Sequence, residues 1–93
     1  MLLLDTCALI FDALEPSRLS RKAIRAIEKG EEQGNLACSD ISLWEIAMLV
    51  AKGRFDPGTD TITFLKLVHA ARRIRIVPIT PEIAAASVEP NVF

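Results

Sequence analysis

The feature that most constrains this chain is a short apolar run at residues 1–4 that ends in a carboxylate at Asp5. An apolar run of this length without polar alternation is typical of a strand buried on both faces at the centre of a parallel sheet. Asp5 would then lie at the carboxyl end of the strand, where open α/β sheets bind ligands. An aspartate in this position could equally cap a helix over residues 6–14. Position alone leaves both roles open.

The composition indicates one small domain with a packed core, because 51% of the 93 residues are hydrophobic. Eleven basic and twelve acidic residues give a net charge of -1, so any contact with a polyanion must come from a local patch. No apolar run approaches the ~18 residues of a membrane span, and the first residues lack the basic leader of a signal peptide. We therefore expect a cytoplasmic protein without a membrane segment. Cys7 and Cys38 lack zinc-site spacing and are expected to be thiols.

Helix-like and strand-like segments alternate along the chain, and this alternation favours an α/β fold over a helical bundle. Strands are predicted near residues 2–5, 36–38 and 74–77, all parallel. Further helices are predicted over residues 20–29 and 61–72, and another begins at residue 81. The candidate N-caps are Ser17 or Ser20, then Thr59 or Asp60, and finally Thr80, and glycines 30 and 34 bracket the end of the helix over residues 20–29.

The second informative stretch, residues 39–54, carries Glu45 on a segment that is apolar almost all round. Ser42 and Glu45 have the spacing of a capping box, which would give Glu45 a purely structural role. A helix that is apolar on every side is buried or covered by a partner. A carboxylate on such a helix is costly to desolvate unless a cation or hydrogen-bond donors meet it. We therefore favour a functional role for Glu45, with the capping box as the alternative.

Two other groups of side chains were weighed as candidates for function. The best local basic patch consists of Arg18, Arg21, Lys22 and Arg25, although such a charge run is usually only a solvated helix face. His69 is the sole histidine and has no base, thiol or second ligand at a suggestive spacing, so we expect it to be a packed or surface residue.

Three separated motifs together resemble the PIN-domain proteins and, among them, the VapC toxins of bacterial toxin–antitoxin pairs. The motifs are Leu-Leu-Leu-Asp-Thr at 2–6, Ser-Leu-Trp-Glu-Ile-Ala-Met-Leu at 42–49 followed by Lys-Gly-Arg at 52–54, and Val-Pro-Ile-Thr-Pro-Glu-Ile-Ala at 77–84. The resemblance implies a PIN-like three-layer fold, with a parallel sheet and helices on both of its faces. It also implies a magnesium- or manganese-dependent endoribonuclease.

The resemblance assigns roles to individual residues. Asp5 falls on the family's first metal acid and Glu45 on its second, so these two are the expected catalytic and metal-binding residues. Thr6 matches the small polar residue beside the first acid, and Thr6 and Ser42 are the expected supporting residues. Lys52 and Arg54 are the candidate RNA contacts, and the expected partner surface, formed with the helix over residues 61–72, contains Trp44, Met48 and Leu49. The implied partners are an RNA substrate, a VapB-like antitoxin and a second copy of the chain in a homodimer.

One departure from the family pattern concerns the end of the chain. Family members continue past the position of Phe93 into an Asp-Pro-x-Asp segment that carries the third acid and often the fourth. We therefore expect residues 1–93 to be a single PIN domain that lacks its C-terminal part, holds Mg²⁺ weakly and cleaves RNA poorly on its own. The first strand would lie at an exposed edge, which favours self-association. The alternative is a degenerate, non-catalytic module that binds an antitoxin or itself.

Overall fold

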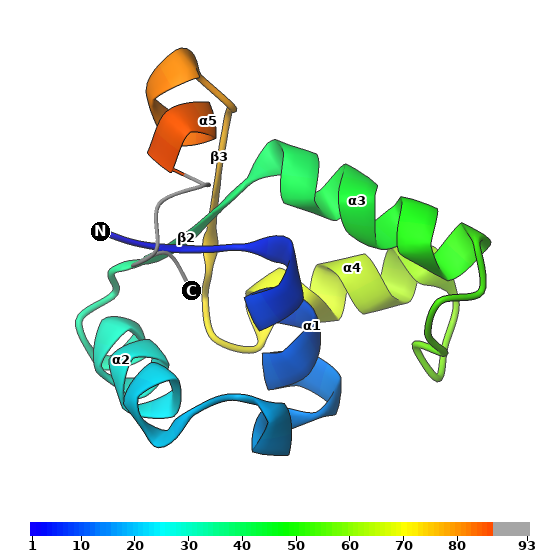
Figure 1. The fold of residues 1–93 in the computed structure, drawn as a ribbon, viewed down its shortest axis with the longest axis horizontal. Coiled ribbons are helices and arrows are strands. Elements are labelled where there is room, and N and C mark those ends of the chain that lie inside the picture. The colour runs from blue at the N-terminus through cyan, green and yellow to red at the C-terminus, as the bar shows by residue number, and fades with distance from the viewer. Residues whose placement is uncertain (87–93) are drawn as a thin grey trace.

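A computed structural model, which describes residues 1–86, shows a parallel three-stranded sheet with helices packed around it (Figure 1). In chain order the elements are β1 (Leu2–Leu4), α1 (Thr6–Leu14), the 3-10 helix η1 (Pro16–Arg18), α2 (Arg21–Glu32), β2 (Leu36–Ser39), α3 (Asp40–Ala51), α4 (Thr61–Ala70), β3 (Arg75–Val77) and α5 (Pro81–Ala86). The predicted α/β class is confirmed, and each of the three strands lies within one residue of its predicted bounds.

The strands are ordered β1-β2-β3, and Leu4 of β1 is in register with Cys38 of β2, which is in turn in register with Ile76 of β3. All four residues of β2 are buried, whereas in β1 only Leu4 is buried. Within the described residues β1 therefore lies at an edge of the sheet, as expected, and β2 occupies the buried centre, so β1 lacks the burial on both faces of which its apolar run is typical. The cause is topological, because β2 has a strand on each side and β1 has a strand on one side only.

Most helices begin where the sequence placed a cap. Ser20 accepts a hydrogen bond from the backbone N–H of Ala23 at 3.0 Å and caps α2, while the other candidate, Ser17, lies inside η1. Asp60 caps α4 through the N–H of Thr63 at 3.0 Å. The remaining predicted cap, Thr80, accepts from the N–H of Ile83 at 3.1 Å. The predicted extension of α4 to residue 72 is wrong, since the helix ends at residue 70 and a turn follows in which residue 73 has a φ of 54°.

Helix α2 continues past the predicted last residue, 29, and through Gly30 to Glu32, so its end lies between Gly30 and Gly34 as expected. Gly30 is buried, and a Cβ added to it would lie only 2.5 Å from Cδ2 of Leu36 in β2. The missing side chain therefore lets α2 approach the central strand closely. The glycine with a left-handed backbone is instead Gly34, with a φ of 62°, in the turn between α2 and β2.

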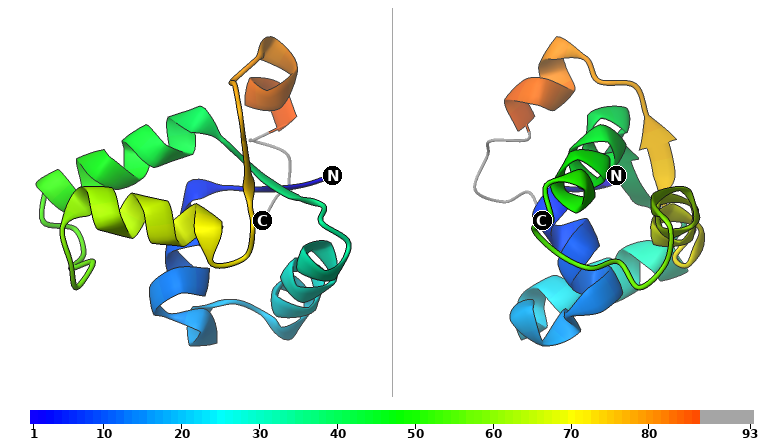
Figure 2. Two further views of the ribbon diagram at one scale, coloured as in Figure 1. Left: turned by 180° about the vertical axis from the view of Figure 1, so that it is seen from behind. Right: turned by 90° about the vertical axis from the view of Figure 1, so that its right-hand side faces the viewer.

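The core lies between the sheet and the helices, and its largest fully buried side chains are Leu4, Leu9, Ile27, Ile46 and Cys38. Helices α2 and α3 contact β2, while α1, α3 and α4 contact one another. Figure 2 shows α3 and α4 side by side, with α5 beyond the end of β3 and apart from that group. Among residues 1–86, no helix is long and apolar enough to cross a membrane.

Arg72, in the turn after α4, ties three parts of the fold together. Its Nε donates to Oδ2 of Asp12 in α1 at 2.7 Å, and its Nη1 donates to Oε2 of Glu31 in α2 at 3.3 Å. Partial burial acts to lower the pKa of Arg72, but the hydrogen bond and charge of Asp12, together with the charge of Glu31, outweigh it and raise the pKa. Asp12 therefore has a structural partner in Arg72.

Candidate functional site

The predicted catalytic and supporting residues, Asp5, Thr6, Ser42 and Glu45, meet where β1 and β2 end and α1 and α3 begin. A pocket of about 410 Å³ lies there, and its polar lining comes from Asp5, Thr6, Cys7, Ser39, Ser42 and Glu45. A larger pocket of about 570 Å³ lies against α1 and α4, around Asp12 and Arg72. The larger pocket contains none of the predicted site residues, so we assign the chemistry to the smaller one.

Asp5 caps α1 and also lines the pocket at the carboxyl end of β1. Its Oδ1 accepts a hydrogen bond from the backbone N–H of Ala8 at 2.7 Å, which makes it the N-cap of α1. The same carboxylate lines the pocket. Within the described part of the chain, its second oxygen, Oδ2, has no hydrogen-bond donor. One oxygen therefore fixes the orientation of the carboxylate, and the other remains available to a ligand.

Glu45 is held by Thr6 rather than by a capping box. The Thr6 hydroxyl donates to Oε1 of Glu45 at 2.8 Å, and its Oγ1 also lies 3.2 Å from Oγ of the buried Ser42. Because a hydroxyl has one hydrogen and Thr6 gives it to Glu45, Ser42 acts as the donor in the second contact. The three side chains form a connected chain across two helices.

The predicted capping box of Ser42 and Glu45 is wrong. The cap of α3 is Ser39, whose Oγ accepts from the backbone N–H of Ile41 at 3.2 Å. The helix consequently begins at Asp40, three residues before the capping-box prediction would have it, and Ser42 lies within the first turn. Freed from any capping role, Glu45 projects from the second turn toward Thr6.

The side chains that line the pocket offer oxygen atoms, which are the ligands that hard divalent cations prefer. Five of the pocket's described side chains offer oxygen, namely the carboxylates of Asp5 and Glu45 and the hydroxyls of Thr6, Ser39 and Ser42. Mg²⁺ and Mn²⁺ prefer oxygen ligands, and two carboxylates satisfy only part of an octahedral shell. Across residues 1–86, no group of three or more His, Cys, Asp or Glu side chains is placed to hold a metal ion. The described residues therefore supply two acids for an ion.

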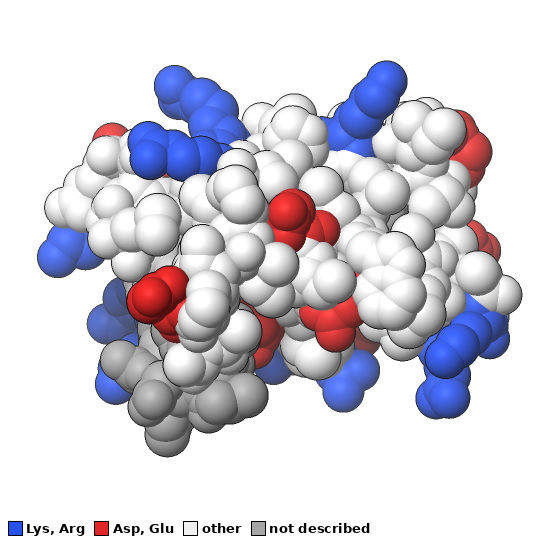
Figure 3. Space-filling view, turned by 90° about the horizontal axis from the view of Figure 1, so that it is seen from above, with Lys and Arg blue, Asp and Glu red and all other residues white. Residues whose placement is uncertain are grey.

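Charged residues are unevenly distributed over this face of the molecule. In Figure 3, which views the structure from the side of α5 and the start of α3, red Asp and Glu residues lie among white residues near the centre, and blue Lys and Arg residues lie toward the rim. A negative centre with a positive rim suits a bound cation and an approaching polyanion at the same time.

Asp40 contributes to the surroundings of the pocket through a contact with one of its lining residues. Its Oδ1 accepts a hydrogen bond from the backbone N–H of Ile79 at 3.0 Å, and Ile79 lines the pocket. Asp40 thereby ties the segment between β3 and α5 to the start of α3. The signal in the sequence was its place directly after the second predicted strand, at the same sheet edge as Asp5.

The two cysteines differ in their surroundings. Cys7 is exposed and lines the pocket, which sequence reasoning did not anticipate. Cys38 is buried in β2, where burial, and secondarily the charge of Asp40, raises the pKa of its thiol. A thiol with a raised pKa is a weak nucleophile, so Cys38 is a core residue.

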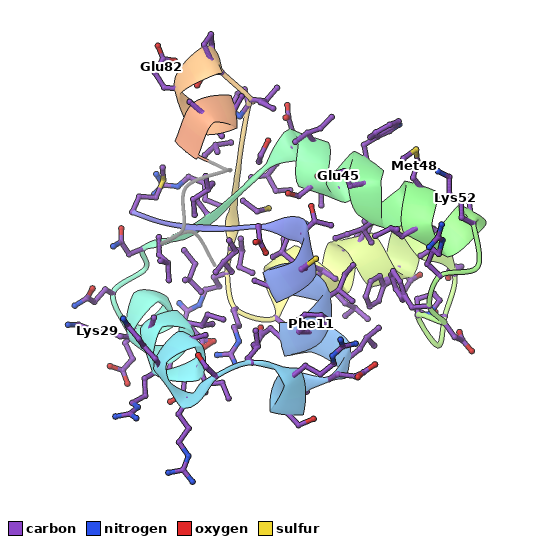
Figure 4. The ribbon with its side chains drawn as sticks, viewed as in Figure 1. Phe11, Lys29, Glu45, Met48, Lys52 and Glu82 are labelled. Carbon is purple, nitrogen blue, oxygen red and sulfur yellow. The ribbon has the colours of Figure 1, made fainter. Side chains whose placement is uncertain are left out.

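The remaining predicted residues lie along α3 and beyond it. Figure 4 shows Glu45, Met48 and Lys52 in that order along the helix. Lys52 is seven residues beyond Glu45, which is ~10 Å along a helix axis, and both Lys52 and Arg54 are exposed outside the pocket. Of the predicted partner surface, Trp44 is 56% exposed, whereas Met48 and Leu49 are half-buried.

Comparison with known proteins gives two matches in sequence. The model of the PIN domain family matches residues 2–90. Ribonuclease VapC22 of Mycobacterium tuberculosis (strain ATCC 25618 / H37Rv) is 36% identical over 86 residues, which are 92% of this chain and 62% of that relative. The chain thus spans about three fifths of the relative's length. No solved structure matches the chain significantly. The family match covers nearly the whole chain and includes both acids of the pocket, and the chain belongs to the PIN-domain family.

Proposed function

We propose that Asp5 and Glu45 belong to a VapC-type endoribonuclease site, which hydrolyses RNA phosphodiester bonds with a divalent cation held at these two residues. The observation that carries the proposal is the hydrogen bond of 2.8 Å from Thr6 to Glu45, which brings the acid of α3 into the pocket of Asp5. Membership of the PIN family and the similarity to a protein named as a ribonuclease support the same reading.

Asp5 and Glu45 would hold Mg²⁺ or Mn²⁺, because they are the only carboxylates that line the pocket among residues 1–86. When bound, such an ion polarises a phosphoryl oxygen and lowers the pKa of a bound water. The chain's own part is to orient the ligands: the cap of α1 fixes Asp5, and Thr6 fixes Glu45. Since two carboxylates leave most positions of the ion to water, we expect weak metal binding.

Contacts to the RNA backbone would come from exposed cations at the rim of the acidic face. Lys52 and Arg54 are both exposed at the C-terminal end of α3. Cations there would attract phosphates by counterion release, so binding should weaken steeply with salt. This agrees with the global charge of -1, which offers no attraction by itself.

The test compares Asp5→Asn and Glu45→Gln with the matched control Asp56→Asn, which changes an exposed loop carboxylate outside the pocket. Both site variants should lose Mn²⁺-dependent cleavage of a labelled RNA and should also weaken Mn²⁺ binding measured by electron paramagnetic resonance. Their circular dichroism should match that of the control. Cleavage or Mn²⁺ binding that survives in Glu45→Gln would remove Glu45 from the site.

A second candidate function is a non-catalytic module that binds a VapB-like antitoxin or a second copy of the chain. The observation that favours it is the apolar surface of two neighbouring helices, where Trp44 of α3 is 56% exposed and Ile62 and Leu67 of α4 are 66% and 56% exposed. Exposed apolar patches often mark interaction sites.

The module is tested by co-expression with the product of the neighbouring upstream reading frame and by the size of the purified chain in solution. Trp44→Ser should abolish co-purification or dimer formation, while Ile76→Ser, at an exposed apolar residue of β3, should not. A monomer that fails to co-purify with the neighbouring product would count against this function.

A further inference from the structure

A second groove begins at Asp5 and runs away from Glu45. It has a volume of about 200 Å³, and its lining includes Asp5, Cys7, Phe11, Arg18 and Ser20. Asp5 and Cys7 line both this groove and the site pocket, so the two hollows meet at the first turn of α1. Phe11 is six residues beyond Asp5, ~9 Å along a helix axis. A strand that lies across the Asp5 carboxylate would therefore enter this groove next.

The far end of the groove carries an exposed cation stacked on an aromatic ring. The guanidinium carbon of Arg18 lies 4.5 Å from the centroid of the Phe11 ring. Phe11 is half-buried on α1 and Arg18 is exposed at the end of η1 (Figure 4 labels Phe11). Within the described residues Arg18 forms no ion pair. Its planar group is thus held in place by Phe11 while its other face and its N–H edge remain open.

Further cations continue the surface beyond Arg18. Arg21, the residue directly after Ser20 of the groove, and Arg25 are exposed on α2 and line a separate hollow together with Ile24. Three arginines thus follow one another from the end of η1 onto α2. They lie next to an acidic site whose carboxylates would repel a phosphodiester in the absence of cations.

We propose that Arg18 and Phe11 form a nucleotide subsite for single-stranded RNA, next to the phosphate that lies at Asp5 and Glu45. The open face of the Arg18 guanidinium stacks on an unpaired base, and Arg21 pairs with the following phosphate. Arginine planes and aromatic rings are common stacking partners of unpaired bases, whereas the bases of a duplex are already stacked. The subsite rests on the proposed ribonuclease function, because it places the rest of the substrate strand.

The subsite is tested by the binding of a dye-labelled oligouridylate to the full 93-residue chain in EDTA, where no metal-dependent cleavage occurs. Arg18→Ala should raise the Kd about tenfold, as expected for the loss of one stacked base. Arg18→Lys keeps the charge but not the plane, so it should raise the Kd nearly as much. Phe11→Leu keeps the apolar volume but loses the ring, and it should also weaken binding.

The matched control is Lys29→Ala, which removes one positive charge from the last turn of α2 (Figure 4) and should change the Kd less than twofold. Equal losses in Arg18→Ala and Lys29→Ala would overturn the subsite, as would duplex RNA that binds as tightly as the single strand. If circular dichroism shows that Arg18→Ala is unfolded, the Kd values of Phe11→Leu and Arg18→Lys test the subsite instead.

This experiment separates the subsite from the proposed function. If RNA cleavage depends on Asp5 but RNA binding does not change in Arg18→Ala, the proposed ribonuclease site is supported and the subsite is rejected. Binding that depends on Arg18 in a chain whose cleavage survives Asp5→Asn would keep the subsite as an RNA-binding site and remove the proposed catalytic role.

Discussion

Thr6 donates its hydroxyl hydrogen to Glu45 across 2.8 Å, although 39 positions separate the two residues in the chain. The contact joins the first turn of α1 to the second turn of α3. It sets the direction in which the Glu45 carboxylate points.

We predict that Thr6→Val, which keeps the shape of the side chain but removes the hydroxyl, lowers metal-dependent RNA cleavage by ~10–100-fold, the usual cost of removing a group that orients a metal ligand. Thr6→Ser keeps the donor and should restore most of the rate. The measurement is the initial rate of RNA cleavage as a function of Mn²⁺ concentration. An unchanged rate in Thr6→Val would show that Glu45 needs no partner.

Asp40 should act through its hydrogen bond to Ile79 and not through its charge. Asp40→Asn keeps an oxygen that can accept the N–H of Ile79 at the observed 3.0 Å, whereas Asp40→Ala does not. We therefore predict that the Ile79 amide exchanges its hydrogen faster in Asp40→Ala, while Asp40→Asn behaves like the parent. Nuclear magnetic resonance reads this amide directly. Loss of Mn²⁺ binding in Asp40→Asn would instead make Asp40 a metal ligand.

Gly30 should tolerate no larger side chain. Gly30→Val would place atoms against the buried side chain of Leu36, whose Cδ2 lies 2.5 Å from the position of a Cβ. We predict a loss of about 1–3 kcal/mol in the free energy of unfolding, typical of overpacking in a core. Urea unfolding measures this loss, and Lys29→Val, at an exposed neighbour in the same helix, controls for the cost of a β-branched residue. Similar losses in the two variants would argue against close packing.

Asp60 should make stability depend on pH. Hydrogen bonds from the Thr63 hydroxyl at 2.7 Å and from the Thr63 backbone N–H at 3.0 Å lower the pKa of Asp60. A carboxyl with a lower pKa in the folded state stabilises the fold above its unfolded pKa, and this contribution disappears as the pH falls through the folded pKa.

We therefore predict that Asp60→Ala lowers the Tm at pH 7 and that the difference from the parent shrinks as the pH falls below about 4, the ordinary pKa of an aspartate. Thermal unfolding at pH 7 and pH 3 tests this. A difference that is the same at both pH values would assign the effect to the backbone of α4 and not to the carboxylate.

The sequence predicts the parts of this fold that depend on local pattern. Short apolar runs and cap residues such as Ser20 and Asp60 locate the strands and most helix starts within a residue or two, because propensity and capping act over a few positions. Ser39 and Ser42 show the limit of such reasoning. Both lie near the start of the same apolar helix, and only the end of β2 at residue 39 decides which of them is the cap.

Contacts between distant segments lay beyond the local pattern. Nothing near Thr6 in the sequence indicates Glu45, and the pairing of the two acids came from resemblance to a family. The place of β1 in the sheet depends on its neighbours and not on its own apolar residues. Likewise, the role of Asp40 depends on a loop that lies 39 positions away.

Because Asp5 caps α1, an acid at this position in a related chain can be explained by folding as well as by catalysis. A side chain that starts a helix is retained for folding alone, and asparagine or serine would serve that purpose as well. An acid at this position is therefore weak evidence that a relative still cuts RNA. Glu45 starts no helix and fills no core position. When a related chain has lost the acid at position 45 but kept the one at position 5, we expect a protein that has given up catalysis and kept its shape.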